Sequence, residues 1–255
     1  MSLEIVIVPC LSDNYAYIIH DEASNKTTLV DAPEFYSVND CLEKRNWNLD
    51  NILITHHHQD HIDGIPQLRD RYNPTIFGAE QDMGRLPKLD VTLTDKDKFS
   101  VSNIIFKCLE VPGHTIGHIA FYCASEKLIF TGDSLMSLGC GRLFEGTAEQ
   151  MLTSLSLISS LPPDTAIYSG HEYANQNAKF ALTVDPKNLD LIARAKRISR
   201  NMKSNSSNVP VTLVEEQKTN PFLRAANKEI QSQIGLDNKD ILEVFTKLRE
   251  MKDNF

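Results

Sequence analysis

The chain has 255 residues, of which 41% are hydrophobic and 24% charged, a composition typical of a folded globular protein. Its net charge of −8 argues against general binding to nucleic acid, and no apolar run approaches the roughly 20 residues of a membrane span, so we expect neither partner. The first residues lack a basic segment, so we expect no signal peptide, and five scattered cysteines without CxxC spacing favour a reducing, cytoplasmic setting.

The charge is distributed unevenly along the chain. Residues 1–174 hold 24 acidic and 12 basic side chains, a net charge of −12, whereas residues 175–255 hold 10 acidic and 14 basic ones, a net charge of +4. Such asymmetry can mark a segment that meets an anion. Two solvated surfaces of different composition would give the same two net charges, and charge alone favours this second interpretation.

The first two-thirds of the chain alternates β-rich runs with turns. Runs of Ile, Val, Thr and Tyr predict strands at residues 3–9, 14–21, 26–32, 51–55, 103–111, 118–124, 127–133 and 165–171. Apolar residues at three- to four-residue spacing predict a helix over Ile62–Tyr72. Another helix is predicted over residues 147–161, because Thr147 and Gln150 form a capping-box pattern and Pro162 follows.

After about residue 174 the strand pattern disappears. Residues 175–184, 188–203 and 239–255 predict helices, and residues 204–210 predict a polar linker. The last helix carries an apolar face and basic residues near its end, where the helix dipole favours them. We therefore predict a mixed α/β (α+β) domain over residues 1–174 and a small helical domain over residues 175–255.

Four of the eight histidines lie within the ten residues "THHHQDHIDG", directly after the strand predicted at 51–55. In extended backbone His56 and His58 point to one side and His57 to the other, and the next turn brings Asp60 and His61 round. Neutral imidazoles around a cation avoid the repulsion of protonated ones, and a carboxylate offsets the metal charge. The alternative is an exposed polyhistidine loop or tag, but a tag belongs at a terminus rather than between a strand and a helix.

Three further polar residues follow predicted strands through a glycine: His114, Asp133 and His171. Loops at strand ends are where enzymes gather their chemistry. The seven candidates exceed the ligands of one structural or catalytic zinc, whereas two ions with three ligands each and one bridging carboxylate use all of them. Nitrogen and oxygen ligands suit zinc, with iron or manganese as alternatives. The predicted ligands are His56, His58, Asp60, His61, His114, Asp133 and His171.

The order of these motifs resembles the metallo-β-lactamase superfamily, which carries T-H-x-H-x-D-H, G-H-T-x-G-H, G-D-S and G-H-E-Y. Four further blocks resemble the glyoxalase II family, the hydroxyacylglutathione hydrolases: "CGRLFEGTAEQM" at 140–151, "SGHEYANQNAKFA" at 169–181, "NPFLR" at 220–224 and the closing "REMKDNF". The similarity covers essentially the whole chain. It implies an αββα metallo-β-lactamase sandwich with a small C-terminal helical domain.

The resemblance also implies roles for the ligands. One ion is expected on His56, His58 and His114, the other on Asp60, His61 and His171, with Asp133 bridging. The implied reaction is hydrolysis of S-D-lactoylglutathione, and of other S-2-hydroxyacylglutathiones, to the hydroxy acid (here D-lactate) and glutathione, the second step of methylglyoxal detoxification. A hydroxide that bridges the ions is the expected nucleophile. Asp60 and Asp133 are therefore the expected catalytic carboxylates, and Asp60 could accept the proton of the water.

Substrate contacts are likewise implied by the resemblance. They are expected at Arg142, Phe144, Tyr173, Arg249 and Lys252. Glutathione carries two carboxylates, which gives the basic tail a candidate purpose. The chain departs from the family at Phe144, where many members have Tyr, and at Asp63, where many have Gly. We expect a monomer.

Several residues near the motifs have plainer interpretations. His57 is expected to face away from the ions, and His118 to pack in the sheet or beside a ligand. Asp31 could brace the histidine loop or cap a turn, with equal weight. Cys140 is expected to be structural. Arg249 is expected at the substrate only because of the resemblance, since a solvated helix end would explain it as well.

Three other kinds of function fit part of the sequence but not all of it. A lactonase or β-lactamase fits the scaffold, but the glutathione blocks and the basic tail argue against it. A mononuclear iron persulfide dioxygenase would need only one set of metal ligands. The second set, Asp60, His61 and His171, therefore argues against it. A metal-dependent binding or nucleic-acid-processing protein fits poorly with an acidic main domain.

Overall fold

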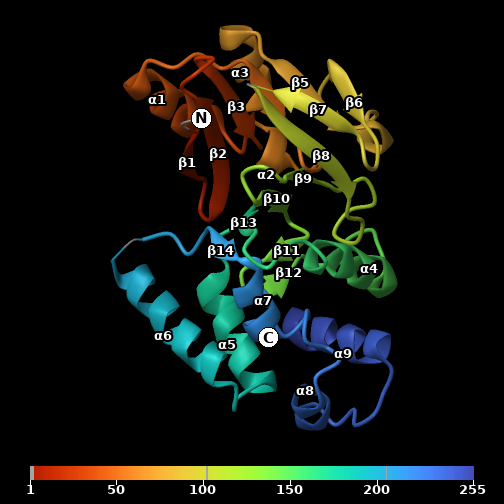
Figure 1. Ribbon diagram of the computed structural model, residues 1–255. Helices are drawn as coiled ribbons and strands as arrows, with labels where there is room; N and C mark the ends of the chain where they lie inside the picture. The colour runs from red at the N-terminus through yellow and green to blue at the C-terminus, as the bar shows by residue number, and fades with distance from the viewer. Residues whose placement is uncertain (1–2, 102, 205) are drawn as a thin grey trace. The chain divides into compact units, whose positions relative to one another are not determined.

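The computed structural model describes residues 3–101, 103–204 and 206–255, and Figure 1 traces them by colour. The chain forms two compact units: the first comprises Met1–Glu110 and Gly117–Gly132, the second Val111–Ile116 and Asp133–Phe255. The predicted domain boundary between residues 174 and 175 stays a prediction. No helix in the described ranges is long and apolar enough to cross a bilayer.

The first sheet of the first unit combines two hairpins with three parallel connections. Its strands in spatial order are β1 (Leu3–Cys10), β2 (Asn14–Asp21), β3 (Lys26–Val30), β4 (Asn51–Leu53), β5 (Thr75–Ala79) and β6 (Val91–Leu93). β1, β2 and β3 pair antiparallel, whereas β3 to β6 pair parallel. Parallel strands need long crossovers, and here those crossovers carry the helices.

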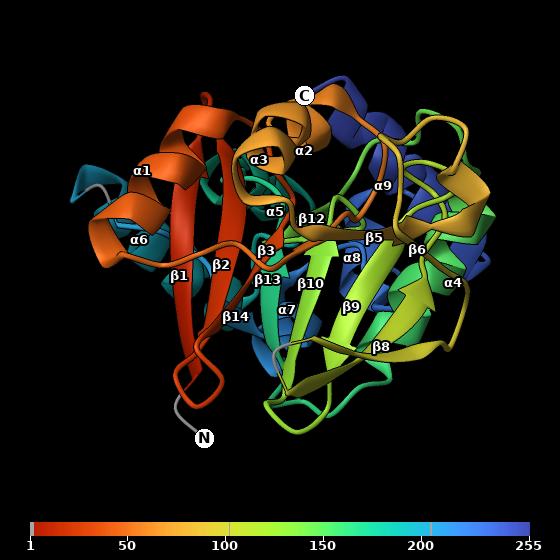
Figure 2. The same ribbon diagram turned by 90° about the horizontal axis from the view of Figure 1, so that it is seen from above.

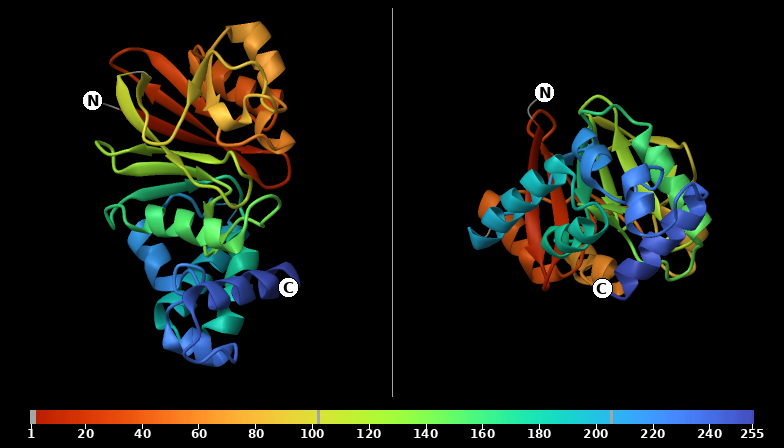
Figure 3. Two further views of the ribbon diagram at one scale, coloured as in Figure 1. Left: turned by 90° about the vertical axis from the view of Figure 1, so that its right-hand side faces the viewer. Right: turned by 90° about the horizontal axis from the view of Figure 1, so that it is seen from below.

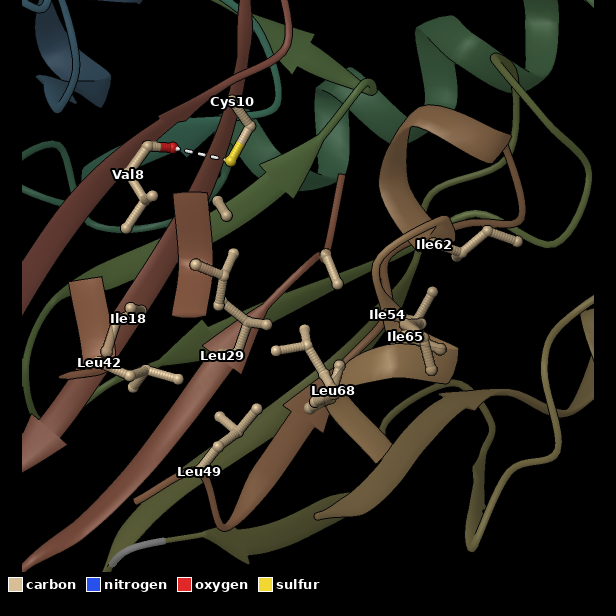
Figure 4. Packing of buried hydrophobic residues seen from close by; sticks show 14 of the residues in the cluster. Val8, Cys10, Ile18, Leu29, Leu42, Leu49, Ile54, Ile62, Ile65 and Leu68 are labelled. Atoms are coloured by element: carbon tan, nitrogen blue, oxygen red, sulfur yellow. Dashed lines mark hydrogen bonds between the residues drawn. The ribbon is translucent and has the colours of Figure 1, made fainter. Parts of the chain in front are cut away.

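Helices cover one face of this sheet. α1 (Phe35–Arg45) connects β3 to β4, and α2 (Gln59–Ile62) with α3 (Ile65–Tyr72) connects β4 to β5. Leu42 of α1 and Leu68 of α3 pack against Ile18 and Leu29 of the sheet, as the close view of the core shows (Figure 4). The helix predicted over Ile62–Tyr72 is present as α3, which begins three residues later, and the short α2 before it was not predicted.

A second, antiparallel set of strands faces the first sheet. It contains β7 (Lys98–Val101), β8 (Ile104–Glu110), β9 (Ile119–Cys123) and β10 (Leu128–Gly132), and β8, β9 and β10 lie side by side in Figure 2. The rings of Tyr17 and Phe130 are 5.4 Å apart, and those of Phe77 and Phe99 are 5.3 Å apart. These aromatic contacts join the two layers of strands.

The second unit is mainly helical. Its elements are β11 (Leu135–Met136), β12 (Gly139–Cys140), α4 (Ala148–Ser159), β13 (Ala166–Ser169), α5 (Ala174–Val184), α6 (Leu189–Lys203), β14 (Val211–Thr212), α7 (Leu213–Thr219), α8 (Lys228–Gln233) and α9 (Ile241–Asp253). Thr147 and Gln150 form the predicted capping box. α5 and α6 bury Ala178, Ala181 and Leu191 against each other, and α9 runs beside α4 (Figure 3).

Most predicted elements are confirmed, with ends shifted by a few residues. The elements that the sequence patterns did not predict are α1, α2, β5, β6, β7, β11, β12, β14, α7, α8 and a 3-10 turn over Glu80–Asp82. The predicted polar linker at 204–210 contains no helix or strand in its described part, and residue 205 lies outside the described residues.

Candidate metal centre

The histidine loop starts where the polypeptide leaves β4 and ends in α2. His56 and His61 are fully buried, while His58 and Asp60 are partly exposed. His56 Nε2 lies 3.1 Å from His58 Nδ1, and the ligand atoms of His56 and His61, and of Asp60 and His61, lie within 4.8 Å of one another. Three imidazoles and a carboxylate this close together match the donor set that a divalent transition metal takes in proteins.

Asp31 braces this loop from the end of β3. Its Oδ1 accepts a hydrogen bond from the Thr55 backbone N–H, and its Oδ2 accepts one from the Thr55 hydroxyl, both at 2.8 Å. His61 Nδ1 lies 2.8 Å from the same Oδ2. With Nδ1 donating to Asp31, His61 keeps Nε2 as its ligand atom, and the contacts favour the bracing role over turn capping. Asp31 has a φ of 56°, a conformation that costs energy in a residue with a Cβ.

Two further side chains orient ligands of the loop. The Thr55 hydroxyl lies 3.0 Å from His56 Nδ1, which leaves Nε2 of that ring for a metal. Asn14, at the start of β2, donates at 2.9 Å to both the backbone oxygen and Oδ2 of Asp60. Sequence patterns gave no sign of this role for Asn14, because it lies 46 residues from Asp60 and reaches the loop through the pairing of β2 with β3 and of β3 with β4.

The other two histidines of the first unit's motifs take the positions expected for them. His57 points away from the ligands, with Nδ1 3.1 Å from Asp82 Oδ2. His118 stacks on His56 with ring centres 4.7 Å apart and an angle of 17° between the planes. His57 therefore faces away from the predicted ligands, and His118 packs beside one of them, His56.

The second unit presents its own group of ligand-type residues: His114, Asp133 and His171. All three are at most 5% exposed. Asp133 Oδ2 lies 3.5 Å from His114 Nε2 and 3.2 Å from His171 Nε2. A carboxylate oxygen between two imidazole nitrogens has the chemistry expected of a metal-bridging ligand.

The backbone around Gly141 holds this group together. His114 Nδ1 donates to the carbonyl oxygen of Arg142 at 2.8 Å, so its Nε2 is the ligand atom. A Cβ at Gly141 would lie 2.1 Å from the Asp133 carbonyl oxygen and 2.8 Å from His114 Nδ1. Only glycine permits this approach, which explains the glycine of the "CGR" block.

Two aromatic rings lie beside these histidines. Tyr173 stacks on His171, with ring centres 4.7 Å apart and planes 7° apart. Phe144 meets the edge of His114 at 5.2 Å and is 63% exposed. Both residues were predicted to contact substrate, and Phe144 presents an accessible apolar face that could do so.

The predicted basic contacts form a cluster around α9. Arg249 is buried, donates at 2.9 Å to the carbonyl oxygen of Cys140, and pairs with Asp253 at 2.8 Å. Arg142 Nε lies 3.7 Å from the same Asp253 carboxylate. Burial, and then the positive charges of Arg249 and Arg142, lower the pKa of Lys252. The three cations outnumber the Asp253 carboxylate, so the cluster has excess positive charge that would attract an anionic ligand.

Cys140 lies inside this cluster. Burial raises the pKa of its thiol to about 11, although Arg249 opposes the shift. The thiol is therefore unreactive, in agreement with a structural role.

Comparison with known proteins decides the family. Residues 12–171 match the model of the metallo-beta-lactamase superfamily, and residues 172–255 match that of the hydroxyacylglutathione hydrolase C-terminus. The hydroxyacylglutathione hydrolase of Ruegeria pomeroyi is 52% identical over 255 residues, with both chains fully covered. The chain belongs to the hydroxyacylglutathione hydrolases. The corresponding protein of Roseobacter denitrificans is 47% identical, again over the full length of both chains.

The family membership confirms the predicted resemblance and the predicted fold class, a metallo-β-lactamase fold with a C-terminal helical domain. The crystal structure of the BLEG-1 B3 metallo-beta-lactamase matches with a TM-score of 0.66 and 20% identity, covering 86% of this chain and 99% of that one. At that identity the match supports the fold alone. The superfamily model matches the chain up to residue 171, and the helical segment that follows is matched by the model of the hydroxyacylglutathione hydrolase C-terminus.

Proposed function

We propose that this protein is a thioesterase that hydrolyses S-D-lactoylglutathione, and other S-2-hydroxyacylglutathiones, to the hydroxy acid and glutathione. The observation that carries the proposal is the full-length identity of 52% to a hydroxyacylglutathione hydrolase. The ligand-type residues and the cations around α9 support it, because the first are donors that divalent metals take and the second would attract an anionic substrate.

In this proposal the predicted ligands hold two divalent ions. His56, His58 and His114 would hold one ion, Asp60, His61 and His171 the other, and Asp133 would bridge them. The separations of 3.1 Å between His56 and His58, and of 3.2 and 3.5 Å from Asp133 to its two histidines, fit such a donor set. Zinc suits these nitrogen and oxygen donors, and iron or manganese would also fit.

The residues of the chain divide the chemistry among them. Two divalent ions, when bound, lower the pKa of water and so supply a nucleophile at neutral pH. Asp60 is held by Asn14 so that its carboxylate can also accept the water's proton. The leaving group is a thiolate, and a thiol pKa of about 8.5 lets it depart with little help from an acid.

We propose that the substrate binds to residues of the second unit. Arg142, Arg249 and Lys252 would attract the glutathione carboxylates, since their mutual repulsion falls when an anion binds. Tyr173 and Phe144 would line the path to the histidines on which they pack. The predicted domain boundary fits this division, with residues 1–174 carrying the ligands and residues 175–255 carrying Arg249 and Lys252.

One assay separates this function from its competitors. Purified protein is tested on S-D-lactoylglutathione, nitrocefin and a lactone, and the metal content of the same sample is measured. The proposal expects rapid hydrolysis of the thioester alone and two metal ions per chain. Preferred turnover of nitrocefin or the lactone would replace the proposed substrate, and a single iron with no thioesterase activity would favour the dioxygenase.

We also propose that the protein works as a cytoplasmic monomer. All five cysteines are free, which fits a reducing compartment. Light scattering on a size-exclusion column tests the oligomeric state, and a mass of twice the chain would overturn the monomer.

A further inference from the structure

The middle histidine of the cluster, His57, is held by a buried acidic residue that follows β5. Asp82 is completely buried, and its Oδ2 lies 3.1 Å from His57 Nδ1. Arg85 donates to Asp82 Oδ1, and its Nη1 lies 3.3 Å from His57 Nε2. Both nitrogens of the ring therefore have a partner in the turn after β5.

These partners define which nitrogen of His57 carries the proton. A guanidinium can only donate hydrogen bonds, so His57 Nε2 accepts from Arg85. Nδ1 then carries the proton and donates it to Asp82. A flip of the ring would exchange each nitrogen for a carbon and lose both contacts, so these partners favour one orientation of His57.

The second glycine of the "GHTIGH" motif makes room for this contact. A Cβ at Gly117 would lie 2.0 Å from Asp82 Oδ1 and 2.3 Å from its Cγ. The carboxylate thus occupies the space that any side chain at position 117 would need. Asp82 is held between the histidine loop and the segment that leads into β9, and Ile119 N–H donates to the Thr55 carbonyl at 2.9 Å beside it.

We propose that Asp82 is a positioning residue for the metal centre. It fixes His57, and through His57 the backbone of residues 56–58, so that His56 and His58 keep their ligand nitrogens together on the opposite side of the loop. Asp31, Thr55 and Asn14 hold ligands of the loop from one side, and Asp82 holds the loop from the other. The inference rests on the proposed assignment of His56 and His58 as ligands.

The test compares Asp82→Ala and Asp82→Asn with Asp90→Asn as a control. Asp90 sits at the opposite end of β5, where its Oδ2 accepts from Arg69 at 2.8 Å and from the Ile76 N–H at 2.9 Å. Like Asp82 it pairs with an arginine, but its hydrogen bonds to the described residues reach α3 and β5 rather than the histidine loop. All three variants are checked by circular dichroism and thermal melting before the metal measurements.

The main measurement is metal affinity by chelator competition, together with the absorption spectrum of the cobalt-substituted protein. Asp82→Ala is expected to weaken binding of one of the two ions by about 10- to 100-fold. Loss of a residue that orients a metal ligand has an effect of this size in other metalloproteins. kcat should fall while the KM for thioester stays within about twofold, because substrate contacts lie elsewhere. Asp82→Asn, which can still accept from His57, should show a smaller loss in the same direction, and Asp90→Asn should match the parent protein.

His56→Ala separates this inference from the proposed function. If His56→Ala leaves metal binding intact, the ligand assignment is wrong and the inference is lost with it. If His56→Ala removes an ion while both Asp82 variants bind two ions with the parent affinity and cobalt spectrum, only the role of Asp82 is overturned. Should Asp82→Ala fail to fold, the isosteric Asp82→Asn decides the matter, and an unchanged affinity in that variant counts against the proposal.

Discussion

The ligand loop of the first unit and the ligand group of the second unit are held in place by different kinds of contact. In the loop, side chains from neighbouring strands make these contacts. Asp31 hydrogen-bonds to the predicted ligand His61, and Asn14 to the predicted ligand Asp60. In the second unit a backbone oxygen, that of Arg142, receives His114. That backbone is in turn tied to α9, because Arg249 donates to the carbonyl oxygen of Cys140 two residues earlier.

This difference has a consequence for how substitutions act. Asp31 and Asn14 contact predicted ligands and Thr55 of the loop, so their loss should change metal binding and leave substrate affinity alone. The brace of His114 shares a short segment with the cations of α9, so changes there should alter substrate affinity and ligand geometry together. The following predictions test that contrast, from the largest expected effect to the smallest.

Removing a ligand should have the largest effect. Asp133→Ala takes away the carboxylate between His114 and His171, and we expect kcat to fall by roughly 10³-fold or more, since a bound metal supplies several kcal/mol to the reaction. Metal content should fall in the same preparation. Steady-state kinetics and metal analysis measure both, and an Asp133→Ala protein with two ions and the parent rate would remove Asp133 from the centre.

Loss of Asp31 should weaken both folding and metal binding. Asp31→Ala leaves two donors of Thr55 and one of His61 without their acceptor, so the free energy of unfolding should fall by about 3 kcal/mol, and metal affinity by about 10- to 100-fold. Urea unfolding and chelator competition measure the two losses. KM should not change, and a rise in KM as large as the loss in affinity would erase the contrast between the units.

Asp31→Gly sharpens this experiment, because it loses the same hydrogen bonds but relaxes the φ of 56°. It should be more stable than Asp31→Ala by about 1 kcal/mol. Equal stability of the two variants would show that the backbone conformation stores no strain.

Charge reversal on α9 should act on substrate. In the double variant Arg249→Glu and Lys252→Glu, the KM for the glutathione thioester should rise by about 10- to 100-fold, as expected for loss of charge-assisted contacts. For a small neutral thioester the rise should stay near twofold. Because Arg249 also holds Cys140, we expect kcat to fall for both substrates, and equal rises in KM would contradict a glutathione site here.

The pH dependence of substrate binding should report on Lys252. Burial and two neighbouring cations lower the pKa of this ammonium, so it loses its charge at a lower pH than an ordinary lysine. An anionic substrate should therefore bind less well as the pH rises, beginning below the usual lysine range. In Lys252→Arg the positive charge persists to higher pH, so KM should rise less with pH than in the parent protein. An equal rise of KM in the variant and the parent would assign the effect to another group.

The smallest effect is expected at Phe144. Phe144→Tyr adds the hydroxyl that many family members carry, on a ring that is already 63% exposed. One added hydrogen bond of about 0.5–1 kcal/mol should lower KM by roughly two- to fivefold. Unchanged metal content is the internal control, and an unchanged KM would show that the hydroxyl makes no contact with substrate.

The strands, and the loops that carry the predicted ligands, could be predicted because their signals are local. Apolar runs mark β1 to β4 and β8 to β10, and each ligand follows a strand end. α1 was missed because Val38 and Leu42 are its only fully buried residues, so its apolar stripe is too narrow to stand out. β5, β6 and β7 are short and partly polar, and only pairing with their neighbours makes them strands.

The braces of the site could not be predicted in the same way. Asn14 and Asp82 lie 46 and 25 residues from the loop residues they contact, and neither belongs to a recognisable pattern. Asp31 was singled out only by resemblance, with an equal alternative. Such roles depend on tertiary contacts, which become visible only after the strands are paired.

The buried thiol of Cys140 also limits unwanted chemistry. A thiolate close to a bound thioester would exchange with it and leave an acyl group on the protein. With a pKa of about 11, only roughly one Cys140 thiol in ten thousand is ionised at neutral pH. At the proposed substrate site, Cys140 would therefore lie close to the thioester without becoming acylated itself.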